Sequence, residues 1–172
     1  MTVPEGAAPA TIRRARAAEV EVLARLWHDG WQDAHAAILP AELARLRTLD
    51  SFRERLRAAL THACVAEVGG APVGFCIVEG DELYQLFVAP RARGTGAAAA
   101  LVADAEARMA AVGVRSAWLA CAIGNDRAAR FYEKCGWHLV GNMISRLPTP
   151  EGVFQLEVWR FEKSLASPLA PG

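Results

Sequence analysis

The 172-residue sequence lacks a surplus of charge of either sign, closely spaced cysteines and any long apolar run. Lys and Arg together number 19, and so do Asp and Glu. This balance argues against nucleic acid or an anionic membrane as the main partner, because both usually attract a basic surplus. No apolar run approaches the roughly 18 residues of a membrane span, and no charged-then-apolar leader is present. We therefore expect a cytoplasmic protein that binds neither nucleic acid nor membrane.

The cysteines and the clustered arginines point to no specialised chemistry. Cys64, Cys76, Cys121 and Cys135 are far apart in apolar surroundings and form no CxxC pair, so we expect buried free thiols rather than a metal site or redox pair. Arginines at positions 45, 47, 53, 55 and 57 are interleaved with acids, which we interpret as a solvated helix face. We expect no metal in the protein.

The two ends of the chain differ in composition from the residues between them. Residues 1–10 and 164–172 are rich in Pro, Ala, Gly and Ser, which is typical of flexible termini. Residues 11–163 contain neither a repeat nor a linker. We expect a single domain there, large enough to bury a core.

Hydrophobic periodicity divides this domain into helices and strands. Helices are predicted at 19–28 (with Gly30 as a break or bend), 41–46, 52–60, 95–112 and 126–135, and strands at 11–15, 63–68, 73–79, 82–88, 116–122, 137–146 and 153–161. Short glycine turns make the strands between 63 and 88 an antiparallel meander. The crossover through helix 95–112 makes strands 82–88 and 116–122 parallel. The prediction is an α/β fold with a mixed sheet.

The Arg- and Gly-rich turn before helix 95–112 is a potential anion site, because the first turn of a helix presents free N–H groups and partial positive charge. Gly94, Gly96 and the alanines after them match the dinucleotide pattern G-x-G-x-x-G/A. However, residues 89–93 separate the strand from the first glycine, and strand 116–122 contains no acid. A triphosphate-binding loop is excluded because no Lys-Ser/Thr pair follows.

Two motifs carry a resemblance to a known family. The first is Arg91-x-x-Gly94-x-Gly96 between a strand and a helix, and the second runs from Asn125 through Phe131-Tyr132 to Gly136-Trp137. Together they resemble the GNAT superfamily of acyl-CoA N-acyltransferases, and the resemblance covers roughly residues 11–161. It implies a mostly antiparallel sheet of six to seven strands flanked by about four helices. It also implies a splay between the central parallel strands.

The resemblance implies acetyl-CoA as the acyl donor. The implied donor-binding residues are Leu86, Phe87, Val88, Arg91, Arg93, Gly94, Thr95, Gly96, Ala97, Asn125, Ala128 and Tyr132. Glycines at the turn would let the backbone approach the pyrophosphate without a Cβ and adopt positive φ, and arginines would add charge-assisted bonds. The pantetheine arm would pair with the strand backbone at 86–88. Asn125 is equally interpreted as a helix N-cap.

Acyl transfer from a thioester to an amine needs a neutral amine, a held oxyanion and a protonated leaving thiolate. By resemblance, Tyr132 is the candidate general acid, and its alternative is an amphipathic core tyrosine. Glu82 is the candidate general base, and its alternative is a carboxylate flanking a turn. Weaker base candidates are Glu79, His28, His35 and Tyr84. A backbone N–H near Val88 would hold the oxyanion.

Trp27, Trp31 and His35 recur at helical spacing, so they share one face if the helix continues past Gly30. Plain core is the simpler interpretation of this stripe, and a pocket wall would favour an acceptor with an apolar part.

The function that we expect is N-acetyl transfer from acetyl-CoA to a primary amine by direct transfer. The acceptor is a small molecule or a peptide, and a homodimer is left open. The alternatives are a non-catalytic CoA-sensing module and a dinucleotide-binding oxidoreductase.

Overall fold

A computed structural model describes residues 9–166 of the chain. The flexible ends expected from composition lie largely outside the described residues, at 1–8 and 167–172. None of the described helices has the length and apolar character that crossing a membrane requires. Within the same residues, no group of three or more His, Cys, Asp and Glu side chains could hold a metal ion. All four cysteines are free, as predicted, and three are buried, whereas Cys135 is only half-buried.

Seven strands form one sheet in the order β1-β2-β3-β4-β5-β7-β6. The strands are β1 (Thr11–Arg14), β2 (Ala63–Val68), β3 (Ala71–Glu79), β4 (Glu82–Val88), β5 (Ser116–Ala122), β6 (His138–Thr149) and β7 (Gly152–Ser164). Neighbouring strands are antiparallel except for the central pair β4 and β5, which is parallel. The predicted mixed sheet is therefore confirmed.

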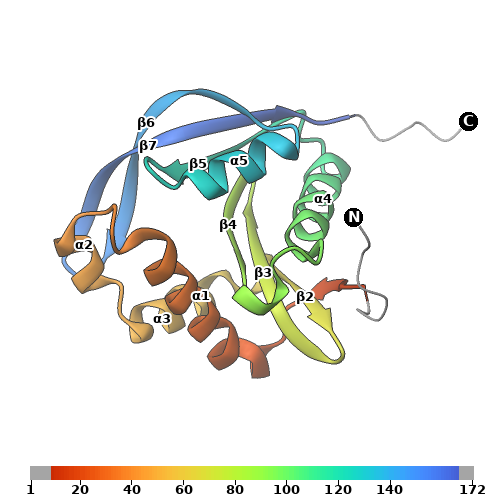
Figure 1. Ribbon diagram of the computed structural model, residues 1–172, viewed down its shortest axis with the longest axis horizontal. Coiled ribbons are helices and arrows are strands. Elements are labelled where there is room, and N and C mark those ends of the chain that lie inside the picture. The colour runs from red at the N-terminus through yellow and green to blue at the C-terminus, as the bar shows by residue number, and fades with distance from the viewer. Residues whose placement is uncertain (1–8, 167–172) are drawn as a thin grey trace, which may run out of the picture.

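Helices cover both faces of the sheet (Figure 1). The α-helices are α1 (Val20–His35), α2 (Ala41–Leu46), α3 (Leu49–Ala59), α4 (Ala97–Ala111) and α5 (Asp126–Lys134), with short 3-10 turns at Ala17–Glu19, Leu60–His62 and Pro90–Ala92. One buried cluster packs α4 against the sheet, and the other packs α1, α2 and α3 against the opposite face. The central strands therefore lie between two hydrophobic layers.

Helix α1 corrects the prediction of a break near Gly30, because it runs without interruption to His35. A Cβ built on Gly30 would lie 2.6 Å from Phe87 Cδ1, so the glycine allows α1 to approach β4 closely. Glycine inside a helix costs about 1 kcal/mol relative to alanine, and this packing offsets that cost. Trp27 and Trp31 are both buried on the resulting continuous face.

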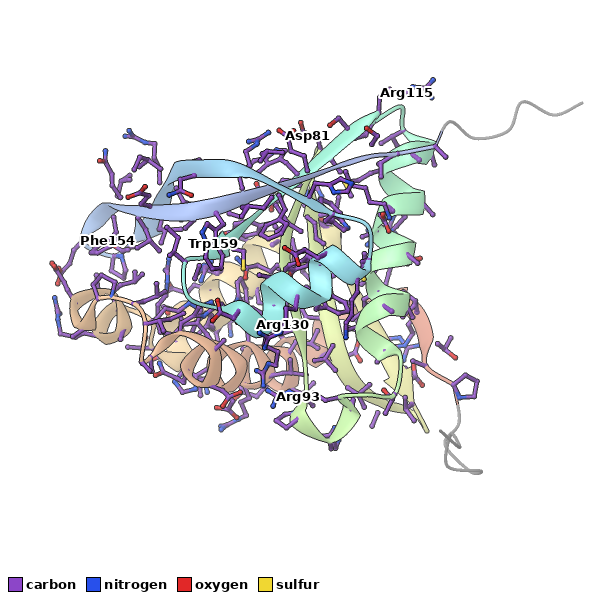
Figure 2. All side chains as sticks on the ribbon, turned by 45° about the horizontal axis from the view of Figure 1, so that its top comes forward. Asp81, Arg93, Arg115, Arg130, Phe154 and Trp159 are labelled. Atoms are coloured by element: carbon purple, nitrogen blue, oxygen red, sulfur yellow. The ribbon has the colours of Figure 1, made fainter. Side chains whose placement is uncertain are left out.

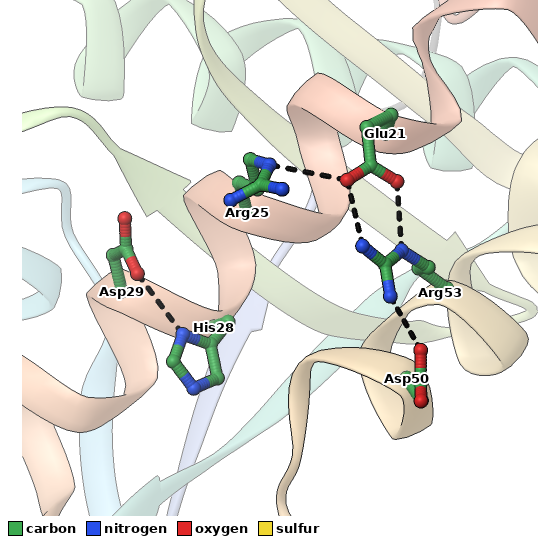
Figure 3. A network of polar contacts seen from close by, with 6 residues as sticks. All are labelled: Glu21, Arg25, His28, Asp29, Asp50 and Arg53. Carbon is green, nitrogen blue, oxygen red and sulfur yellow. Dashed lines mark hydrogen bonds and ion pairs between the residues drawn. The ribbon is translucent and has the colours of Figure 1, made fainter.

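An ion-pair network holds α3 against α1 (Figure 3). The Arg53 guanidinium donates to both carboxylate oxygens of Glu21, at 2.7 and 2.8 Å, and also contacts Asp50. Exposed pairs of this kind contribute only about 0–1 kcal/mol each, so their role is chiefly to align the two helices over the buried Phe52.

The central strands separate soon after they meet. Within the described chain, the β4–β5 ladder contains the single pair Glu82 and Trp118, reinforced by a 3.0 Å bond from the Trp118 N–H to the Asp81 carbonyl. Beyond this point the β5-facing edge of β4 is open. Strand β4 also contains a β-bulge at Tyr84. Ile77 pairs with Gln85 and Val78 pairs with Leu83, so Tyr84 between them has no partner on β3. The predicted splay is confirmed.

Candidate active site

The glycine turn follows the open end of β4 after the short 3-10 turn Pro90–Ala92. Gly94 and Gly96 have φ values of 76° and 87°, and Gly96 is the N-cap residue of α4. A Cβ at either position would meet no protein atom within 4 Å. Glycine is therefore required here by the left-handed backbone conformation, whereas the protein itself leaves space beside both residues.

The turn leaves several backbone amides unused. In the part of the chain that the structure describes, the N–H groups of Gly94, Gly96, Ala98 and Ala99 have no hydrogen-bond acceptor. These amides lie around the N-terminus of α4, where the helix dipole adds partial positive charge. Unused amides at a helix N-terminus can bind an anion such as a phosphate.

A cavity of about 390 Å³ lies beside these amides. Its walls come from the turn and α4, from β4, from α5 and from α1. Among the residues implied by the family resemblance, it brings together Leu86, Phe87, Val88, Arg93, Gly94, Gly96, Asn125, Ala128 and Tyr132. We refer to this space as the donor cavity. Its volume falls within the range of roughly 300–1,000 Å³ typical of small-molecule sites.

Three residues implied by the resemblance are absent from the lining of the donor cavity. The Thr95 hydroxyl donates to the Ala92 carbonyl and accepts the Ala97 N–H at 3.4 Å. The Ala97 side chain is fully buried in the α4 core. Arg91 is exposed, and its guanidinium lies 3.4 Å from the Pro72 carbonyl. Thr95 and Ala97 support the turn, and donor contacts by these three residues stay a prediction.

Helix α1 contributes residues to the donor cavity that sequence reasoning missed. Gly30 and Ala34, four residues apart, present a small-residue face to it. Asp33 forms ion pairs with Arg93 at 2.8 Å and with Arg127 at 3.4 Å, and these arginines lower the pKa of its carboxyl group. Figure 2 shows Arg93 at the turn between β4 and α4. Because Asp33 lies 60 positions before Arg93, no local pattern could reveal this bridge.

A second cavity, of about 150 Å³, adjoins the donor cavity along β4. We call it the acceptor-side cavity. It is enclosed by α1, α2, α3, β4, β5 and the β6–β7 hairpin, and it contains Trp31, His35 and Glu82. Five residues line both cavities, namely Leu86, Phe87, Asn125, Ala128 and Tyr132. The two cavities therefore meet where β4 and α5 face each other across the splay.

Tyr132 stands at this junction. Its ring packs 6.1 Å from Phe161 and 6.5 Å from Trp137, which fixes its position on α5. Its hydroxyl has no hydrogen-bond partner within residues 9–166. Burial raises the pKa of this hydroxyl, so it stays protonated and available as a donor. Asn125 caps α5 by accepting the Ala128 N–H at 3.4 Å, so its predicted capping role is confirmed.

Glu82 lies at the start of β4 in the wall of the acceptor-side cavity. Burial, followed by repulsion from Glu79 and Asp81, raises the pKa of its carboxyl group to about 7, while Arg160 acts in the opposite direction. A carboxylate with such a pKa can accept a proton near neutral pH, which an ordinary glutamate does poorly.

The weaker base candidates are less suited to this role. His35 lines the acceptor-side cavity, but burial lowers the pKa of its imidazole to about 4. Tyr84 also lines it, and the Tyr84 hydroxyl accepts a 2.9 Å hydrogen bond from Arg55. Neither His28, which contacts Asp29 at 2.9 Å, nor the exposed Glu79 is among the residues lining the two described cavities.

Two further residues of the acceptor-side cavity contradict the prediction of a solvated arginine face. Arg47 is only 2% exposed and Arg55 is half-buried, and both line this cavity. Arg47 follows the last turn of the short α2, so its orientation depends on tertiary packing rather than on helical periodicity. The alternation of arginines with acids gave no signal that would separate these two from their exposed neighbours.

The comparisons with known proteins agree with this geometry. Residues 21–137 match the model of the acetyltransferase (GNAT) family. Uncharacterized N-acetyltransferases of Mycobacterium tuberculosis and Mycobacterium bovis are 36% identical over 117 residues, which cover 65% of this chain and 72% of theirs.

Similar solved structures cover nearly the whole chain. A GCN5-related N-acetyltransferase from Rhodopseudomonas palustris has a TM-score of 0.74 and 21% identity, covering 96% of this chain and 99% of its own. YjaB from Escherichia coli in its apo form has a TM-score of 0.71 and 26% identity, covering 94% and 100%. The PaiA N-acetyltransferase of Thermoplasma acidophilum, solved in complex with coenzyme A, has a TM-score of 0.70 and 18% identity, covering 91% and 99%.

Proposed function

The chain belongs to the acetyltransferase (GNAT) family and is an acyltransferase, and we propose that it transfers an acetyl group directly from acetyl-CoA to a primary amine. The observation that carries this proposal is the meeting of the two cavities at Tyr132, Leu86 and Phe87. A donor in one cavity and an acceptor in the other would approach each other at that junction without an enzyme-bound acyl intermediate.

The donor cavity offers the groups that acetyl-CoA requires. The four unused amides around Gly96 would hold the pyrophosphate, and Arg93 would add charge-assisted bonds. The open edge of β4 would pair with the amide groups of the pantetheine arm, as an added strand does. The structural neighbour that contains coenzyme A supports this choice of donor.

Glu82 would prepare the amine for attack. An ordinary alkylamine has a pKa near 10.4, so freeing its lone pair at pH 7 costs on the order of 4–5 kcal/mol. A carboxylate with a pKa of about 7, acting directly or through water, accepts this proton. The neutral nitrogen then attacks the thioester carbonyl, while a backbone N–H of β4 near Val88 stabilises the oxyanion.

Tyr132 would assist the departure of the thiolate. Tyr132 lines both cavities, and its hydroxyl is free to donate a hydrogen bond. Since burial raises the pKa of this phenol further above the value near 8.5 of a thiol, complete proton transfer from Tyr132 would be uphill. We therefore assign Tyr132 a hydrogen bond to the developing thiolate, with the proton coming finally from the attacking amine.

The two alternatives make different demands on the site. A non-catalytic CoA-sensing module would need no carboxyl group with a raised pKa in the acceptor-side cavity, whereas Glu82 lies there with such a pKa. A dinucleotide oxidoreductase is disfavoured by the family to which the chain belongs.

Cytoplasmic location and a homodimer stay predictions. For the homodimer, the edge strand β6 exposes Leu139, Val140 and Ile144, which a second copy could cover.

Thermal unfolding with candidate donors tests the proposal. At a concentration one hundred times Kd, a ligand of the native state contributes about 2.7 kcal/mol, which is several degrees of Tm for a domain of this size. We expect acetyl-CoA to raise Tm by several degrees and NADH to leave Tm unchanged. A rise with NADH and none with acetyl-CoA would overturn the assignment.

A further inference from the structure

The five arginines between α2 and the end of α3 differ in their partners and in their exposure. Arg45 contacts Glu151 at 3.3 Å, and Arg53 pairs with Glu21 and Asp50 (Figure 3). Arg57 is exposed, whereas Arg47 is buried and Arg55 is half-buried. Neither of these two guanidinium groups has a carboxylate partner within residues 9–166. These two unpaired arginines both line the acceptor-side cavity.

The hydrogen bonds of this arginine pair go only to neutral groups. Arg47 donates to the Pro148 carbonyl at 3.0 Å, and Arg55 donates to the Tyr84 hydroxyl at 2.9 Å. The Nε atom of Arg55 is buried without an acceptor. Burial and the neighbouring Arg55 lower the pKa of Arg47 to about 10, which still leaves Arg47 charged at neutral pH. Burying a cation without a counter-ion costs free energy. An anion that binds in the cavity would lower this cost.

Both guanidinium groups are held in place before any ligand arrives. The Arg55 guanidinium carbon lies 4.4 Å above the Trp27 ring and 5.5 Å from the Phe52 ring, which are rigid parts of the α1–α3 layer. Arg47 is fixed by the β6–β7 hairpin, whose Phe154 lies close to α2 in Figure 2. A preorganised cationic pair loses little entropy on binding an anionic group.

Glu82 occupies a different electrostatic region of the same cavity. The charges that act on its pKa are those of Glu79, Asp81 and Arg160, and neither arginine of the pair is among them. Likewise, the charges that act on Arg47 include no carboxylate. One part of the cavity is therefore cationic, and a separate part holds the Glu82 carboxylate, which can accept a proton.

Building on the proposed function, we propose that the acceptor is a small primary amine that also carries a carboxylate or phosphonate group. Arg47 and Arg55 bind the anionic group, and the amine faces Glu82. The cavity volume of about 150 Å³ suits a compact molecule of this kind. Polyamines and simple alkylamines are poor acceptors, because they bring no anion to the arginine pair.

Matched acceptors test this specificity. For each side chain, acetylation of the free amino acid, of the corresponding aminoalkylphosphonate and of the amine without an anionic group is compared at saturating acetyl-CoA. We expect kcat/KM to be at least tenfold higher for the better anionic acceptor than for the bare amine, and the better of the two anions identifies the natural group. Equal rates with the bare amine would overturn the proposal.

Variants assign the preference to the two arginines. Arg55→Met should reduce the preference for the anionic acceptor at least tenfold, about 1.4 kcal/mol, mainly by raising its KM. Arg47→Met should act in the same way, and Arg47→Lys, which retains the charge, should keep part of the preference. The matched control is Arg57→Met, since Arg57 is exposed on the same helix and lines neither cavity. A preference that survives in both Met variants would contradict the proposal.

A binding measurement separates this inference from the proposed function. With coenzyme A saturating the donor cavity, methylphosphonate should raise the Tm of the wild type and of Arg57→Met, but not that of Arg55→Met. This result requires no acetyl transfer, so it holds even if the reaction is assigned wrongly. An equal rise in all three proteins would overturn the arginine site, whereas absence of any stabilisation by coenzyme A would count against the proposed function.

Discussion

Replacement of Glu82 by glutamine should make the protein more stable and less active at the same time. Burial and two neighbouring acids raise the pKa of this carboxyl group from 4.5 to about 7. Each tenfold change in proton affinity corresponds to 1.36 kcal/mol, so keeping Glu82 ionised in the native state costs roughly 3 kcal/mol. Glu82→Gln removes the charge and with it this cost.

The size of this stability gain depends on pH. Below pH 4.5 the carboxyl group is protonated in both native and unfolded states, so the ionisation cost is absent. As the pH rises from 4.5 to 7, the unfolded state loses this proton first, and wild-type stability falls by the full amount once the pH exceeds 7. Glu82→Gln should therefore be more stable than wild type at pH 8 by up to roughly 3 kcal/mol and by less than about 1 kcal/mol at pH 5.

Urea unfolding at both pH values measures this difference, with the exposed Glu54→Gln on α3 as the control. The same Glu82→Gln protein should lose roughly 10²–10⁴-fold in kcat/KM at pH 8 if Glu82 is the general base. Wild-type kcat/KM should rise with pH through a pKa of about 7, because the base must be ionised to act. Equal stability gains at pH 5 and pH 8, or an unchanged rate, would refute this reasoning.

Three further substitutions test the rest of the site. Tyr132→Phe should lower kcat about a hundredfold while changing the donor Kd less than about threefold, and normal turnover would remove the role of its hydroxyl. Gly96→Val forces a branched side chain into positive φ at a cost on the order of 1–2 kcal/mol, so donor affinity measured by calorimetry should fall about tenfold; unchanged affinity would count against the anion site. Asp33→Asn releases Arg93 and Arg127 from their ion pairs, which should tighten coenzyme A binding roughly two- to fivefold at low salt; weaker binding would show that Asp33 orients the arginines instead.

Local features of the sequence predicted the fold and the backbone conformation of the glycine turn. The order of strands around the crossover followed from short glycine turns and one long helix, and the structure confirms the parallel pair β4 and β5. The glycines at 94 and 96 indicated positive φ before a helix, which the backbone shows. Such features depend on neighbouring residues, so one chain suffices to predict them.

The acceptor side could not be predicted in the same way, because contacts between distant segments create it. The continuity of α1 depends on Phe87 packing against Gly30, and the burial of Arg47 depends on the Pro148 carbonyl, 101 positions later. The raised pKa of Glu82 arises largely from tertiary burial. Spacing and composition carry little information about such contacts, and the alternation of charges around Arg47 suggested exposure instead.

The most direct test of direct acetyl transfer is an acceptor panel in which released thiol and acetylated product are measured together. With acetyl-CoA and purified protein, one molecule of free coenzyme A should appear for each N-acetylated amine identified by mass, and no acetylated protein should accumulate when the acceptor is omitted. Accumulation of an acetyl-enzyme that then acetylates the amine, or binding of acetyl-CoA without acetylation of any amine in the panel, would contradict the account.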